Sequence, residues 1–169
     1  YAKRALDLTQ HTSLRQLERA ELFARLGEAD FVLGKPQAAV DHMKQAIEQT
    51  GFVVDVDGAG PRGAIMRQVI VQVAHRLLPA FAYQSTNNAD DVLAVSRLSE
   101  QTLLIWFWQK HLALLFLASL LMVNSAERTR PSRELLIAYG NLAATVGTIL
   151  TWHRVARVYE RLMEYVARQ

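Results

Sequence analysis

The sequence predicts an all-α protein in which about seven helices form stacked hairpins. Apolar residues recur at helical spacing through most of the chain, which is the pattern of helices that bury one face. Glycine and proline stand where these runs stop, because Gly34 and Pro36 separate two of them and Pro79 closes a third. With 169 residues, of which 51% are apolar, the chain is long enough for a single domain, residues 1–169, with its own core.

The first complete hairpin is expected in residues 13–51. Ser13 is suited to cap its first helix, and Pro36 stands in the first turn of its second helix. Gly27 and Ala39 are small enough to let the two helices cross closely. The larger apolar side chains predicted around this crossing and along the buried stripe are Phe23, Leu26, Met43 and Ala46.

The spacing of these residues is similar to that of a tetratricopeptide repeat, W-x2-L-G-x2-Y followed by A-x3-F. Phe23, Leu26 and Gly27 take positions of the first half, and Ala39 and Met43 take those of the second. A unit of this size cannot bury its own apolar face and has to stack on neighbours. The resemblance therefore implies a tetratricopeptide-like right-handed superhelix, with these residues packed at the helix crossings.

Residues 52–63, FVVDVDGAGPRG, are expected to form a glycine-rich loop between helices. Gly58, Gly60 and Gly63 also match G-x-G-x-x-G, so a nucleotide-binding module that uses this loop is an alternative function. The chain offers one candidate strand here and no second strand of a βαβ unit, which disfavours that alternative. We expect no cofactor.

Three further helices are expected in the middle of the chain, at 64–78, about 90–108 and 112–126. Residues 102–123 are its most hydrophobic part, and a membrane-associated helical segment is a second alternative, since about 20 apolar residues cross a bilayer. Lys110 lies in the middle of this stretch, and a central lysine costs about 2.5–3.5 kcal/mol on insertion scales. A polar turn at 109–111 is the better interpretation, and no membrane partner is expected.

The last hairpin follows a polar loop, and Ser132 is suited to cap its first helix. The repeat order returns in this hairpin, with Val155 in the position of the repeat's alanine. Its predicted packing residues are Tyr139, Leu142, Ala143, Tyr159 and Leu162. The middle hairpin is more degenerate, because Leu104 takes an apolar position while Arg97 occupies another.

Most of the chain also resembles the helical region that follows the ATPase module in bacterial multidomain signalling proteins, including those fused to class III adenylate or guanylate cyclases. The segments that carry the likeness are LGKPQAAVDHMKQAI, VAHRLLP, RLSEQ, LLMVNSAERTRPSRELLIAYGNLAATVG and RVARVYERLMEYV. The resemblance implies a non-enzymatic scaffold or regulatory relay that contacts other domains or a partner protein. The chain starts at Tyr1 in what reads as a helix already under way, and we expect a fragment of a longer protein.

Composition adds several expectations about chemistry. The chain has no cysteine, which favours a reducing cytoplasm and excludes thiolate sites. The five histidines show no i, i+4 pair, so surface or capping histidines are expected rather than a metal site. Nineteen basic against sixteen acidic residues give a net charge of +3, too weak to predict a nucleic-acid partner. We expect no enzymatic activity in this region.

Two groups of residues are predicted to contact a protein partner or a second copy of the chain. Arg154, Arg157 and Arg161 share roughly one face of the last helix, where a solvated face is the alternative to an acidic partner. Trp106 and Trp108 flank another aromatic residue, and consecutive helical residues point about 100° apart. At least one ring of this ridge is therefore expected outside the core.

Overall fold

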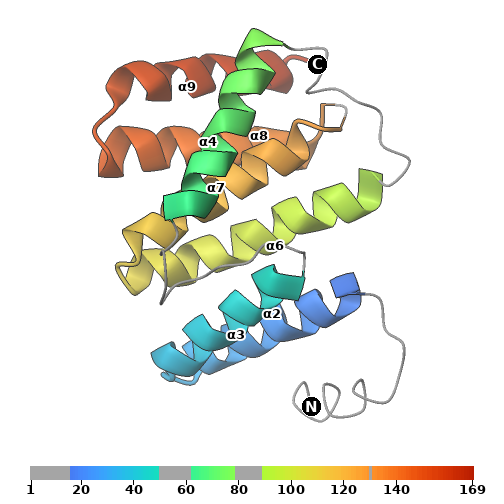
Figure 1. Ribbon diagram of the computed structural model, residues 1–169, viewed down its shortest axis with the longest axis vertical. Coiled ribbons are helices and arrows are strands. Elements are labelled where there is room, and N and C mark those ends of the chain that lie inside the picture. Colours follow the sequence, from blue (N-terminus) through green and yellow to red (C-terminus); the bar gives the residue numbers. More distant parts are fainter. Residues whose placement is uncertain (1–15, 50–61, 79–88, 130) are drawn as a thin grey trace.

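The computed structural model describes residues 16–49, 62–78, 89–129 and 131–169 (Figure 1). These residues form seven α-helices and a short π-helical segment, with no strand among them, so the predicted all-α class is confirmed. The elements are α2 (Gln16–Val32), α3 (Pro36–Gln49), α4 (Arg62–Leu77), α6 (Ala89–Trp108), α7 (Leu112–Ala126), α8 (Arg133–Ala144), η1 (Thr145–Ile149) and α9 (His153–Ala167). The predicted cap Ser13, the closing Pro79, and Gly58 and Gly60 lie outside the described residues.

The helices pair as three hairpins, α2 with α3, α6 with α7, and α8 with α9. The hairpins are layered, because α6 contacts both α2 and α3, and α7 contacts α8. Helix α4 does not join this order. It follows α3 in the chain but lies across α7, on one side of the last two hairpins (Figure 1).

Local backbone chemistry explains where several helices end. Gly34 has a φ of 71°, a left-handed conformation that glycine adopts without a steric penalty, and Pro36 then begins α3. Lys110 has a φ of 59° in the turn between α6 and α7, which confirms the predicted polar turn. The Ser132 side chain accepts a hydrogen bond from the Leu135 amide at 3.2 Å, as expected of an N-cap.

Helix α4 begins two residues earlier than predicted, at Arg62. Gly63 therefore lies in the first turn of a helix, and the prediction of a loop as far as residue 63 is wrong.

The predicted repeat-packing residues are all buried or partly buried, and all but Leu26 and Gly27 lie in or against one core. Phe23 and Leu162 are partly buried against it, and the buried members of the predicted set are Leu26, Gly27, Ala39, Met43, Ala46, Tyr139, Leu142, Ala143 and Tyr159. The repeat positions assigned to Leu104 and Val155 are wrong, because both side chains are exposed. In the last hairpin the small residue at the crossing is Ala156, whose Cβ would lie 3.1 Å from a Cβ added at Gly147.

The segment η1 contains Gly147 and is a π-helical turn, which holds one residue more than an α-helical turn. The Leu150 amide donates to the carbonyl of Thr145 at 3.3 Å, five residues back instead of four. Thr151 then takes a φ of 57°, and α9 starts two residues later.

The aromatic ridge splits between the core and the surface. Trp106 is 0% exposed, which corrects its assignment as a partner contact. Phe107 and Trp108 are 51% and 61% exposed, because the three rings point in different directions around α6. The contact predicted for Trp108 stays a prediction.

We predict that Gly27→Leu lowers the free energy of unfolding by about 1–3 kcal/mol, the usual cost of overpacking. A Cβ at Gly27 would already lie 3.0 Å from Met43 Cε and 3.1 Å from the carbonyl oxygen of Ala39. Urea denaturation measures the loss. Gly63→Leu is the matched control, because no described atom lies within 4 Å of its added Cβ, and equal losses in both variants would contradict the prediction.

Candidate functional site

Helix α4 is turned with its polar side inward. Gln68, Gln72 and His75 are buried against the rest of the molecule. The opposite side carries an apolar stripe, which we call the outer stripe of α4, and its members are Met66 (61% exposed), Ile70 (61%), Val73 (51%) and Leu77 (73%). These positions share one helix face by their spacing. A helix at a protein surface normally buries such a stripe, so the orientation of α4 needs a cause.

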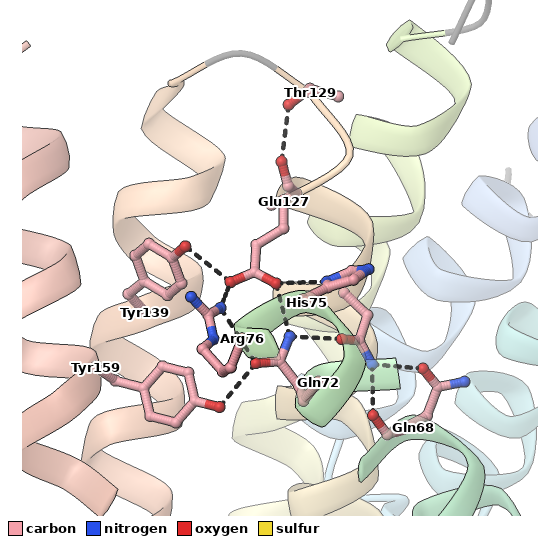
Figure 2. A network of polar contacts seen from close by, with 10 residues as sticks. Gln68, Gln72, His75, Arg76, Glu127, Thr129, Tyr139 and Tyr159 are labelled. Carbon is pink, nitrogen blue, oxygen red and sulfur yellow. Dashed lines mark hydrogen bonds and ion pairs between the residues drawn. The ribbon is translucent and has the colours of Figure 1, made fainter. Parts of the chain in front are cut away.

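The cause is a buried carboxylate at the end of α7. Glu127 is 1% exposed, and Figure 2 shows side chains from α4 and α8 converging on it. Its Oε2 accepts from His75 Nδ1 at 2.7 Å and from Gln72 Nε2 at 2.8 Å. Its Oε1 accepts from the Tyr139 hydroxyl at 2.8 Å and forms an ion pair with Arg76. Both carboxylate oxygens are therefore satisfied without water.

Gln72 extends the network in two further directions. Its Nε2 also donates to Asn124 Oδ1 at 2.6 Å, and its Oε1 accepts from the Tyr159 hydroxyl at 2.7 Å. Asn124 Nδ2 donates to the carbonyl and to the side-chain oxygen of Gln68, at 3.0 Å and 2.7 Å. Gln72 thus links α4 both to α7, through Asn124, and to α9, through Tyr159 (Figure 2).

Arg76 balances the charge of Glu127. Its guanidinium carbon lies 5.8 Å and 5.7 Å from the ring centroids of Tyr139 and Tyr159, within range of cation–π attraction. The side chain is 32% exposed, so the ion pair sits between the core and solvent. A buried pair of this kind is costly to break, since the remaining charge would have no counter-charge.

Burial changes the titration of two members of the network. It lowers the pKa of His75, and the nearby charges of Arg76 and Arg128 lower it further. His75 is therefore neutral at pH 7 and donates its Nδ1 proton to the carboxylate, which can only accept. Burial also raises the pKa of the Tyr159 hydroxyl, which keeps it a donor to Gln72.

A cavity of about 320 Å³ lies beside this network, and we call it the α4–α9 cleft. Gln72, Arg76 and Tyr159 form part of its lining, with their polar groups engaged in the network. Its apolar walls come from α4, α7, α8, η1 and α9, and include Val69, Val73, Leu77, Leu120, Leu142 and Val155. A second cavity, of about 330 Å³, lies between α6 and α8, and Leu104 and Phe107 line it.

The arginines predicted to contact a partner lie outside this polar network. Arg154, Arg157 and Arg161 are exposed on α9 and form no ion pair with any described residue. The histidine prediction is wrong for His75, which is buried. The signal for the network was the placement of Gln68, Gln72 and His75 at helical spacing on one face of α4, opposite an apolar stripe.

The described residues show no sign of a metal site or of a membrane-spanning helix. Among the described residues, no group of three potential metal ligands gathers, and no helix has the length and apolar character to cross a membrane. No protein-family model, curated protein or solved structure matches the chain.

We predict that Glu127→Gln lowers the free energy of unfolding by about 3–5 kcal/mol, because Arg76 loses its counter-charge in a largely buried site. Urea denaturation at pH 7 measures the change. Glu134→Gln is the control, since Glu134 pairs with the half-exposed Arg97 at 3.1 Å and exposed pairs contribute at most about 1 kcal/mol. Equal losses of unfolding free energy in the two variants would contradict the prediction.

We predict that the unfolding free energy falls as pH is lowered below 6.5, the ordinary pKa of histidine. In this range the unfolded chain binds a proton that folded, buried His75 does not, and the slope from one such group is at most about 1.4 kcal/mol per pH unit. Denaturation curves from pH 7.5 to 5 measure it. His75→Asn should remove this part of the slope, while His153→Asn, on the exposed start of α9, should keep it; an unchanged slope in His75→Asn would refute the assignment.

Proposed function

We propose that this region is a non-enzymatic helical-repeat scaffold that mediates protein–protein or inter-domain contacts through the outer stripe of α4. In this proposal it is a regulatory relay within a larger cytoplasmic signalling ATPase or nucleotide cyclase. The observation that carries the proposal is that α4 holds four large apolar side chains outward while its polar side is buried. Exposed apolar surface of this kind is typical of sites that another surface covers.

The energetics favour a covered stripe. Full burial of one large apolar side chain stabilises a structure by about 1.5–3 kcal/mol. Turning α4 over to gain this within the chain would leave Glu127 without Gln72 and His75. The polar network therefore fixes the stripe outward, and a second protein surface is the partner that can cover it.

The hairpin order supports a tetratricopeptide-like arrangement. Helices α2 and α3, α6 and α7, and α8 and α9 pair as consecutive hairpins, and neighbouring hairpins contact one another. In the proposed superhelix, α4 is the helix that does not follow the repeat order, and its outer stripe is where a partner binds. A relay follows from its attachments, because a partner that shifts α4 also acts on α7, α8 and α9 through Gln72 and Glu127.

We predict that a photo-crosslinking amino acid at Ile70, introduced into the protein as cells produce it, forms a light-dependent crosslink to another protein or to a separate domain. The same group at Val32, an exposed apolar position at the end of α2, should not. Gel mobility and mass spectrometry identify the product. Identical patterns at both positions would contradict a contact at α4, and hydrolysis of ATP or synthesis of cyclic nucleotide by the purified region would contradict a non-enzymatic scaffold.

A further inference from the structure

The second cavity, between α6 and α8, is a groove with a chemistry of its own, and we call it the α6–α8 groove. Its two walls are helical stripes, each with members at positions i, i+3, i+4 and i+7. The stripes are Glu100, Leu103, Leu104 and Phe107 on α6, and Asn141 and Ala144 on α8 with Thr145 and Thr148 on η1. Leu115 of α7 also lines the groove, and it forms the floor together with Leu103 and Thr145, since these three residues are buried.

The two ends of the groove differ in polarity. Helices α6 and α8 run in the same direction (Figure 1), so Glu100 and Asn141, the first residue of each stripe, lie toward the same end. Phe107 and Ile149 line the other end, and Phe107 is half-exposed. Seven residues of helix separate Glu100 from Phe107, which is about 10 Å along the axis. The groove therefore has a polar end and an apolar end.

The hydroxyl groups in the groove have no proton left for a ligand. Ser119 Oγ donates to the Leu115 carbonyl at 2.9 Å, so the Thr145 hydroxyl has to be the donor in its 3.0 Å contact with Ser119. The Thr148 hydroxyl donates to the carbonyl of Ala144 at 2.5 Å. Both threonines can therefore only accept a further hydrogen bond.

Glu100 and Asn141 also present acceptors. The Glu100 carboxylate forms no ion pair with a described residue, and Arg97, one turn earlier on α6, is paired with Glu134 at 3.1 Å. Asn141 Nδ2 lies 3.6 Å from Met122 Sδ, which leaves the Oδ1 atom of this amide as its acceptor. No described basic residue lines the groove. A negative charge in a recess that offers acceptors is complementary to a cation that donates hydrogen bonds.

We propose that the α6–α8 groove binds a small organic cation, an ammonium group on an apolar alkyl or aryl body. The ammonium group faces Glu100 and donates to Asn141 Oδ1, and the body lies along the groove over Leu103 and Leu115 toward Phe107. A volume of about 330 Å³ suits a ligand of this size. The site is separate from α4, so this inference goes beyond the proposed scaffold function and does not depend on it.

A lysine side chain of a protein partner carries the same group but fits less well. A side chain that enters from solvent brings its ammonium group to the floor, which is largely formed by Leu103 and Leu115. Glu100 and Asn141 stand at one end of the groove instead. A small ligand that lies along the groove reaches both of them and still covers the apolar walls.

The test uses three compounds with one body and different head groups, phenylbutylamine, phenylbutanol and phenylbutyrate. NMR titration of the isotope-labelled chain at pH 7 measures each affinity and locates the binding site. The amine should bind about tenfold or more tightly than the alcohol, and the acid most weakly, with shifts at Leu103 and Thr145. Glu100→Gln should weaken the amine about tenfold and leave the alcohol unchanged, which also shows that the variant is folded. Glu28→Gln, at an exposed carboxylate of α2, is the matched control and should change neither affinity.

Filling the groove gives a second arm. Ala144 lines the groove and is exposed, so the ring of Ala144→Phe occupies the groove without entering the core, and it should weaken the amine and the alcohol alike. No binding of the amine, equal affinity for the amine and the acid, or unchanged amine binding in Glu100→Gln would overturn the inference. Shifts confined to the α4–α9 cleft would also overturn it. A lysine-containing peptide that shifts the same resonances when the amine does not would overturn it in favour of a protein partner.

Discussion

The arrangement of the C-terminal hairpins depends on one buried carboxylate. Glu127, at the end of α7, accepts hydrogen bonds from Gln72 and His75 of α4 and from Tyr139 of α8, and it forms an ion pair with Arg76 of α4. One carboxylate that is almost inaccessible to water therefore joins three helices. A buried charge tolerates only an environment that satisfies it fully. That requirement decides which side of α4 faces inward, and it outweighs the ordinary preference to bury apolar side chains.

The outward apolar surface is a consequence of this constraint. Because the polar residues of α4 are needed inside, Ile70, Val73 and Leu77 remain in solvent, and the space between α4 and α9 is lined by apolar walls. The same network that creates the exposed surface also connects it to the hairpins behind it. A surface for contact and a path to the rest of the fold therefore arise from one set of hydrogen bonds.

Sequence patterns predicted the helices well because their ends carry local chemical signals, such as Gly34, Pro36 and Ser132. They predicted the crossing at Gly27, where close approach requires a small residue. They missed the network because Glu127 stands in a polar run that reads as a loop, and its partners on α4 lie about fifty residues away in the chain. A pattern within a short stretch of sequence does not indicate which distant residue a side chain will contact.

The wide turn η1 has a consequence for how this hairpin tolerates insertions and deletions. A π-helical turn holds one residue more than an α-helical turn, which accounts for the buried alanine standing at 156 rather than 155. Removing a single residue from this turn would restore α-helical spacing and shorten by one residue the chain that leads into α9. Tyr159 would then be displaced relative to Gln72, so the junction between α9 and α4 depends on the length of this segment and not only on its composition.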